Sequence, residues 1–464
     1  MMSKLNNVIR YWKHYGTRSL LGHSWEIFII NPYRFRMGYQ RKVPVFPQIY
    51  MDDLKMQQNI INKDKLNICY LIHYFYPAKH GGTERFVLNL AHQQQKLGNN
   101  PIVITLGNES LDQYDRKVGQ IYYRTYYYEG VLVYEIRHKK APLGIYYKEI
   151  HVDDSALTGF ADYILSEQNI DIVHLAYPQP FYSFAMTARK KRIPVVLTGT
   201  DFNLFCHYAT MVTRKGDFCD GSQFGNKCKD VCFTYGCPDL KKRFQKAANY
   251  LTNVQKITVP SKFVANVFLN EFSNINVQVV SHGIDARFNS ERKRTTTRKF
   301  IYAGTLSELK GVHLLIAAFE QLEGSYQLEI YGSVESDYAK QLMQTKDSRI
   351  VFKNAVKASK MPEIYNNADC VIVPSIWYET YNFVVREALT CGCLVVASEI
   401  GAMPEAIVEN KNGFLFNPGD KESLLMALKL SAEFDWKQYK QAMFPTVEEE
   451  GRVYSQIYHE LING

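Results

Sequence analysis

Residues 377–405 read W-Y-E-T-Y-N-F-V-V-R-E-A-L-T-C-G-C-L-V-V-A-S-E-I-G-A-M-P-E, and this run predicts a loop, a helix and a strand. Directly before it, residues 369–374 (D-C-V-I-V-P) have the apolar pattern of a short buried strand, and residues 394–397 have the same pattern. Apolar residues between these two strands recur at helical spacing, and Gly392 stands where such a helix would end. The predicted unit is therefore strand, loop, helix, strand.

Two glutamates of this unit are placed to bind a ligand. Glu379 lies in the loop after the buried strand, and Glu387 lies eight residues further, about 12 Å along at the helical rise. Two glutamates on one helix are usually solvated surface charges, but open parallel sheets bind ligands at the carboxyl ends of their strands. A ligand of two sugar rings joined by a diphosphate would reach both carboxylates. Its phosphates would rest on the N–H groups of the helix start, at Asn382, Phe383 and Val384.

The pattern E-x7-E, followed by A-L-x-C-G, a strand and I-G-A-x-x-E, resembles the donor site of the retaining glycosyltransferases of family 4. By the domain lengths that it implies, the resemblance covers roughly the last four hundred residues. It implies an α/β protein of the GT-B fold, in which two Rossmann-like domains face a central cleft. Residues 64–285 would form the acceptor-side domain, residues 286–440 the nucleotide-sugar-binding domain, and residues 441–464 a helix that crosses back to the first domain.

The composition is that of an ordinary globular protein, with 464 residues, 46% hydrophobic and 22% charged, so two or three domains are expected. No apolar run approaches the ~18 residues that span a bilayer. No signal-peptide pattern opens the chain, and we therefore expect a cytoplasmic protein.

Residues 1–63 form a basic extension with short amphipathic helices. Within it, residues 1–43 carry eight Lys or Arg against one Glu, which is +7 of the net charge of +9. Because the charge belongs to this segment, nucleic acid is not an expected partner. Basic, aromatic and apolar residues together predict peripheral attachment to an anionic membrane surface, on the inner face of the cell membrane. Packing of these helices on the protein's own body is an equal alternative.

The first predicted strand spans residues 66–73, and a glycine-rich loop follows it. Residues 80–85 read H-G-G-T-E-R, and a helix is expected from there to about Leu97. Glycines allow a backbone to approach a phosphate or sugar closely, although G-G-T alone is more often a tight turn. The resemblance implies that Gly81 and Gly82 contact the donor diphosphate or the acceptor.

Three positions depart from the family pattern. Where family 4 enzymes have His-Asp on the sugar side of the cleft, this chain has Thr200 and Asp201. Where they have Gly-Arg, this chain has Gly304 and Thr305 on the donor side. His282 replaces the asparagine of the hinge motif.

Lys310, in contrast, matches the family lysine and would supply a cation to the departing β-phosphate. A lone lysine at a helix start is otherwise a solvated charge, in a position that is mildly unfavourable for a cation.

Five cysteines cluster in the polar loop at residues 203–240. The last four are Cys219, Cys228, Cys232 and Cys237, and the final three of these have C-x3-C-x4-C spacing. In a reducing compartment this pattern favours a structural zinc site over disulfides. An iron–sulfur cluster and thiols that bind nothing are the alternatives. The remaining cysteines, in apolar settings, are predicted core residues: Cys69, Cys370, Cys391 and Cys393.

The resemblance implies transfer of a hexose from a nucleotide-diphosphate sugar to a hydroxyl of a glycan or lipid-linked acceptor, with retention of configuration, in surface polysaccharide synthesis. Lys310, the helix start and the glycine loop would stabilise the leaving diphosphate, so no cofactor is required for the chemistry. Glu387 would accept hydrogen bonds from the ribose, and Glu379 would orient the sugar. Two other functions compete: a non-catalytic nucleotide-sugar-binding partner subunit, and another GT-B enzyme such as a nucleotide-sugar epimerase.

Overall fold

The computed structural model describes residues 65–140, 154–232, 240–272, 274–290 and 293–463. The basic extension at residues 1–63 and Cys237 lie outside the described residues. No helix in the described part of the chain is long and apolar enough to cross a membrane.

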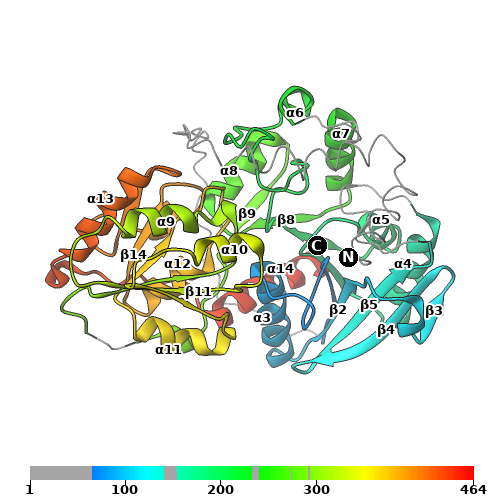
Figure 1. Cartoon of the computed structure of the whole chain (residues 1–464). Coiled ribbons are helices and arrows are strands. Elements are labelled where there is room, and N and C mark those ends of the chain that lie inside the picture. Colours follow the sequence, from blue (N-terminus) through cyan, green and yellow to red (C-terminus); the bar gives the residue numbers. More distant parts are fainter. Residues whose placement is uncertain (1–64, 141–153, 233–239, 273, 291–292, 464) are drawn as a thin grey trace.

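The first of two units, which lie side by side in Figure 1, is built on a nine-stranded sheet. Its strands in chain order are β1 (Asn67–Leu71), β2 (Asn100–Leu106), β3 (Arg116–Val118), β4 (Ile121–Tyr128), β5 (Val131–His138), β6 (Ile172–Leu175), β7 (Val195–Thr198), β8 (Lys256–Val259) and β9 (Val277–Val279). Their order across the sheet is β3-β4-β5-β2-β1-β6-β7-β8-β9. Its helices are α3 (Gly82–Lys96), α4 (Ser155–Glu167), α5 (Tyr182–Lys190), α6 (Asn226–Val231), α7 (Leu240–Leu251) and α8 (Lys262–Glu271).

The second unit is built on a six-stranded sheet in which every neighbouring pair is parallel. Its strands are β10 (Lys299–Ala303), β11 (Gln327–Tyr331), β12 (Ile350–Lys353), β13 (Cys370–Val373), β14 (Leu394–Ser398) and β15 (Gly413–Phe416), in the order β12-β11-β10-β13-β14-β15. The accompanying helices are α9 (Val312–Phe319), α10 (Asp337–Leu342), α11 (Met361–Asn366), α12 (Phe383–Thr390) and α13 (Lys421–Ala432). Two α/β sheets of this kind agree with the predicted architecture.

The central strands are buried on both faces, which explains their continuous apolar sequences. In β1, Ile68 and Tyr70 belong to the core that α3 contributes to, and Cys69 and Leu71 belong to the core on the opposite face. Successive side chains of a strand point to opposite faces, so one short apolar run fills both cores. The four cysteines that were predicted as core residues are all fully buried.

One edge of the first sheet departs from the parallel arrangement of the Rossmann-like domain that the sequence resemblance implied. β4 pairs antiparallel with both β3 and β5. The turn between β4 and β5 consists of Glu129 and Gly130, both at positive φ (45° and 82°), which is the geometry of a tight hairpin turn. The sequence of β4, I-Y-Y-R-T-Y-Y-Y, is half-exposed and polar in part, and it lacks the apolar run of a central strand.

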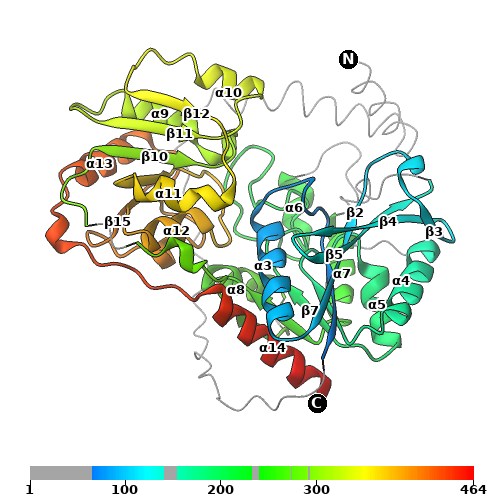
Figure 2. The same cartoon turned by 90° about the horizontal axis from the view of Figure 1, so that it is seen from below.

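The last helix, α14 (Val447–Asn463), returns to the first unit and lies beside α3, as Figure 2 shows. The hydroxyl of Tyr458 lies 2.6 Å from Nδ1 of His174 and 3.2 Å from the hydroxyl of Tyr70. Gly451 allows the close approach to α3, because a Cβ atom there would lie 2.4 Å from Cβ of Gln93. The end of the chain thus completes the core of the unit in which the described chain begins.

Candidate active site

Glu379 lies in the loop after β13, where one of its carboxylate oxygens gathers three donors. Oε1 accepts hydrogen bonds from Nζ of Lys310 at 2.6 Å, from Oγ of Ser375 at 2.7 Å and from Nε1 of Trp377 at 2.8 Å. Lys310 also lies over the Trp377 ring, 4.8 Å from its centroid. The site therefore holds a carboxylate and a cation together at the carboxyl ends of the strands.

The charge on Glu379 is maintained despite its burial. Burial of the side chain tends to raise its pKa, but the Lys310 charge and the three hydrogen bonds outweigh this effect and hold the pKa below its usual value. Glu379 is therefore ionised at neutral pH. A fixed negative charge of this kind can stabilise positive charge that develops on a bound sugar.

Two glycines, Gly401 and Gly311, are required by close backbone packing around the Glu379 loop. A Cβ atom at Gly401, where φ is +65°, would lie 2.4 Å from the carbonyl oxygen of Glu379. The next residue, Ala402, donates its N–H to that same oxygen at 2.8 Å. On the other side, a Cβ atom at Gly311 would lie 1.9 Å from the carbonyl oxygen of Pro374. Only glycine fits at either position. The I-G-A motif, through Gly401, and the K-G motif, through Gly311, therefore pack against the Glu379 loop from both sides.

The start of α12 lies against the glycine-rich loop of the first unit. Asn382 is the N-cap residue with φ of 62°, and its side chain accepts the N–H of Val385 at 3.1 Å. The ring of Phe383 comes within 3.7 Å of the position that a Cβ atom of Gly82 would have, and it stacks on His282 with 8° between the planes. The structure thus brings the predicted donor-binding residues of the two units together.

Glu387 is buried one turn further along α12 and forms an ion pair with Arg85 of α3. Its other oxygen accepts the hydroxyl of Tyr365 at 3.3 Å. Burial raises the pKa of Glu387, and the charge of Arg85 offsets this effect in part. Arg85 also lies 4.7 Å from the centroid of the Phe383 ring. The carboxylate that was predicted to bind a ribose therefore joins the two units in this structure.

The two units also meet at Thr200 and Asp201, which follow β7. The hydroxyl of Thr380 donates to the carbonyl of Thr200 at 2.9 Å, and this contact places Thr200 beside the Glu379 loop. The Thr200 hydroxyl itself donates to the carbonyl of Ala176 at 3.0 Å, so it is engaged within its own unit. Burial raises the pKa of Asp201 to about 7, although the N–H of Asn203 acts in the opposite direction. The Asp201 carboxyl can therefore exchange a proton near neutral pH.

Gly304 and Thr305 follow β10. The carbonyl of Thr305 accepts the hydroxyl of Tyr302 at 2.8 Å, and Gly304 has φ of 155°. The charge of Glu379 contributes to the raised pKa of the buried Tyr302, after the larger effect of burial itself. These residues therefore belong to the same end of the sheet as Glu379.

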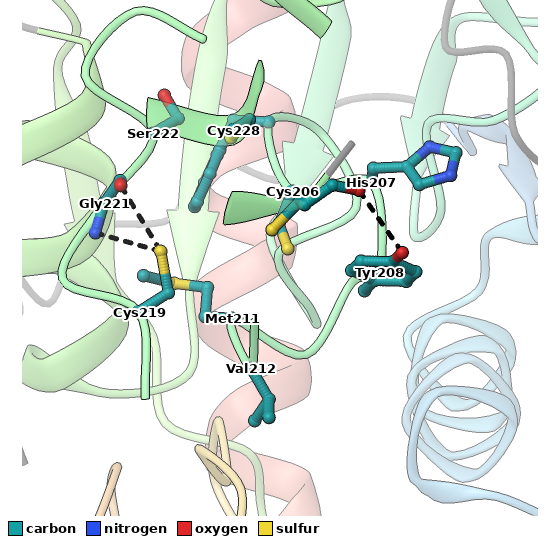
Figure 3. A pocket seen from close by; sticks show the side chains of 11 residues that line it. Cys206, His207, Tyr208, Met211, Val212, Cys219, Gly221, Ser222 and Cys228 are labelled. Atoms are coloured by element: carbon teal, nitrogen blue, oxygen red, sulfur yellow. Dashed lines mark hydrogen bonds between the residues drawn. The ribbon is translucent and has the colours of Figure 1, made fainter. Parts of the chain in front are cut away.

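The cysteine-rich loop lies over the first unit, and its side chains line one cavity (Figure 3). The cysteines at this cavity are Cys206, Cys219, Cys228 and Cys232. Three of them belong to the predicted metal-binding set, Cys206 lines the cavity in addition, and Cys237 lies outside the described residues. Within the described ranges, no group of three or more His, Cys, Asp or Glu side chains is already placed to hold a metal ion.

Sequence reasoning missed three side chains of this site. They are Arg85, in the run H-G-G-T-E-R, and Ser375 and Trp377, which flank the start of the Glu379 loop. The signal for the latter two was their position directly after a buried strand, which is where ligand-binding residues of parallel sheets lie. Arg85 had no such signal, because its partner Glu387 is remote in the sequence.

Two family models match the chain. The model described as Glycosyltransferase Family 4 covers residues 80–288, and the model described as Glycosyl transferases group 1 covers residues 284–440. The two matched regions include Gly82 and Thr200 in the first, and Lys310, Glu379 and Glu387 in the second.

Several curated proteins are similar over part of the chain. The glycogen synthase of Mycobacterium tuberculosis is 27% identical over 191 residues, which are 35% of this chain and 45% of that protein. The lipopolysaccharide 1,2-N-acetylglucosaminetransferase of Salmonella typhimurium is 26% identical over 197 residues, which are 37% of this chain and 52% of that protein. The chain thus spans about half the length of these relatives.

Solved structures share the fold over most of the chain. A glycosyltransferase from Rickettsia africae has a TM-score of 0.58 at 17% identity, over 87% of this chain and 100% of that chain. The Anabaena protein HepE in complex with UDP-glucose has a TM-score of 0.57 at 18% identity, over 86% and 98%. These likenesses confirm the predicted GT-B fold. By the two family models, which together match residues 80–440, the chain belongs to the glycosyltransferases, with a family 4 region followed by a group 1 region.

Proposed function

We propose that this chain is a retaining hexosyltransferase, which moves a hexose from a nucleotide-diphosphate sugar to a hydroxyl of a glycan or lipid-linked acceptor. The observation that carries the proposal is the ionised Glu379, held 2.6 Å from Lys310 beside the contact between the two units. A carboxylate for the sugar and a cation for the phosphate are the charges that such a transfer requires.

The proposed reaction breaks the bond between the anomeric carbon and the oxygen of the β-phosphate. Negative charge then develops on the departing diphosphate, and Lys310 and the N-terminus of α12 stabilise it. The acceptor oxygen forms its bond to the anomeric carbon on the face that the diphosphate leaves, and its proton passes to the departing phosphate. Glu379 offsets the positive charge of the sugar ring during this exchange.

The comparisons support the substrate classes of this proposal. The Anabaena protein HepE of similar fold binds UDP-glucose, which is a nucleotide-diphosphate hexose. One similar curated protein is a lipopolysaccharide N-acetylglucosaminetransferase, which supports a role in surface polysaccharide synthesis.

The test is donor turnover without acceptor. Purified protein is incubated with a panel of UDP-, ADP-, GDP- and dTDP-hexoses, and the released nucleoside diphosphate is measured. We expect slow hydrolysis of at least one donor, at a rate that added Mg²⁺ does not change, because Lys310 takes the place of a metal at the phosphate. A nucleoside diphosphate that binds while no donor is turned over, with or without membrane extract as acceptor source, would instead support the non-catalytic partner subunit. The engaged hydroxyl of Thr200 is the observation that favours this second function.

We also propose that residues 1–43 attach the protein to the inner face of the cell membrane. Their charge of +7 is drawn to anionic lipid, and such attraction is screened by salt. The full chain should sediment with vesicles that contain anionic lipid, and less so as salt is added. A shortened protein that begins at Asp64 should remain in solution. Equal sedimentation of the two proteins would contradict this attachment.

A further inference from the structure

Four cysteines from separate parts of the loop at residues 203–240 meet at one cavity (Figure 3). Cys206 follows the Thr200–Asp201 segment, Cys219 follows the bridge between Val212 and Phe218, and the other two, Cys228 and Cys232, lie on α6 and at its C-cap. Three of these side chains are buried, with exposed fractions of 8% for Cys219, 9% for Cys228 and 7% for Cys232, and Cys206 is half-buried. The fold therefore concentrates four sulfur atoms that are far apart in the sequence.

Backbone N–H groups are directed at two of these sulfur atoms. Burial raises the pKa of the Cys206 thiol, and the nearby backbone N–H groups of Met211, Tyr208 and Thr210 act in the opposite direction. At Cys219, the N–H of Gly221 donates to Sγ at 3.5 Å, and the thiol donates to the carbonyl oxygen of Gly221 at 3.3 Å; Figure 3 draws both bonds as dashed lines. A neutral thiol is a weak acceptor, whereas a thiolate is a strong one. The N–H groups beside Cys206 and Cys219 would therefore stabilise the thiolate form, which burial alone disfavours.

We propose that Cys206, Cys219, Cys228 and Cys232 bind one Zn²⁺ ion as tetrahedral thiolate ligands. Zn²⁺ prefers four-coordinate sulfur sites, and the N–H groups at Cys206 and Cys219 supply the outer hydrogen bonds that orient such ligands. The side chains are not placed as a ready ligand set, so binding draws the sulfur atoms together by rotation about their Cα–Cβ bonds. The set that sequence spacing suggested has Cys237 in the place of Cys206, and Cys237 lies outside the described residues.

The proposed ion would act on the active site through aromatic packing. Phe218, next to Cys219, contacts the ring of Tyr378 at 5.4 Å between centroids. Tyr378 also stacks on Phe263, and it directly precedes Glu379 in the sequence. The ion therefore fixes a loop that supports the Glu379 side chain from the first unit. This consequence for activity rests on the proposed transferase function, whereas the binding of the ion does not.

The experiment measures metal in the full chain, purified without chelator. We expect about one zinc per chain in the wild type, as a closed four-ligand site requires. Cys206→Ser and Cys228→Ser should each lower the zinc content at least tenfold. The matched control is Cys370→Ala, which removes a buried thiol of the second unit and should leave the zinc content unchanged.

A second measurement uses only the wild-type protein, so it does not depend on whether the variants fold. Wild-type protein reconstituted with Co²⁺ should show intense sulfur-to-cobalt charge-transfer absorption and the visible bands of tetrahedral coordination. Wild-type protein that carries no zinc and gives no such absorption with Co²⁺ would overturn the proposal, as would the spectrum of an iron–sulfur cluster. Full zinc content in Cys206→Ser, with loss of zinc in Cys237→Ser, would overturn the assigned ligand set.

Discussion

Replacing Glu379 by alanine is expected to lower donor turnover by about 100- to 1,000-fold, which is the usual cost of removing one preorganised charge-stabilising group. The variant loses the carboxylate that faces the sugar. It also leaves Lys310, Ser375 and Trp377 without the oxygen to which all three donate. Turnover is measured as nucleoside diphosphate released from the best donor of the panel.

Two further variants test whether the loss belongs to the charge of Glu379. Glu379→Gln keeps the shape of the side chain and should lose nearly as much turnover as the alanine variant. Glu399→Ala removes an exposed glutamate after the neighbouring strand β14, and it should keep wild-type turnover. If Glu379→Ala remains folded and turns over its donor at more than a tenth of the wild-type rate, the assignment of Glu379 is wrong.

Removing Arg85 is expected to destabilise the protein by about 3–5 kcal/mol, because it leaves Glu387 buried without its partner. The side chain of Glu387 is 3% exposed and that of Arg85 is 18% exposed. Glu387→Ala should therefore cost less stability, since Arg85 can reach water and still lies over the Phe383 ring. Unfolding free energies from denaturant titration measure this difference. Lys96→Ala, which breaks an exposed ion pair between α3 and α14, should cost less than about 1 kcal/mol.

The same variants test the ligand of Glu387. If this carboxylate accepts hydrogen bonds from a ribose, Glu387→Ala should weaken nucleotide binding by about 10- to 150-fold, which corresponds to 1.5–3 kcal/mol for bonds to a charged group. Calorimetry of the nucleotide bound by the wild type gives the dissociation constant. An unchanged constant in folded Glu387→Ala would contradict the ribose assignment and leave Glu387 as a purely structural partner of Arg85.

The sequence was most informative where strands are buried on both faces. The strands predicted at residues 66–73, 369–374 and 394–397 correspond to β1, β13 and β14, because short apolar runs bounded by polar residues are typical of buried strands. The edge strand β4 was missed, since its tyrosines are half-exposed and give no apolar run. Short helices such as α10 and α11 were missed for a similar reason, because six residues show less than two turns of any periodic pattern.

The sequence names candidate site residues but not the contacts among them. Glu379 and Lys310 were assigned to the sugar and to the phosphate separately, whereas the structure pairs them across 69 positions of the chain. Cys206 was left out of the predicted metal-binding set because regular spacing is visible in a sequence. Proximity through a folded loop is not visible there.

The return of α14 to the first unit has a consequence for the order of synthesis. Tyr70 and Tyr458 are 388 positions apart, and both side chains are fully buried. A ribosome releases β1 long before it has made α14, so the unit that emerges first is the last to complete its core. Contacts of such separation also slow folding, since a long loop must close before they are gained. A chain that stops before α14 therefore lacks part of the core of the unit that was translated first.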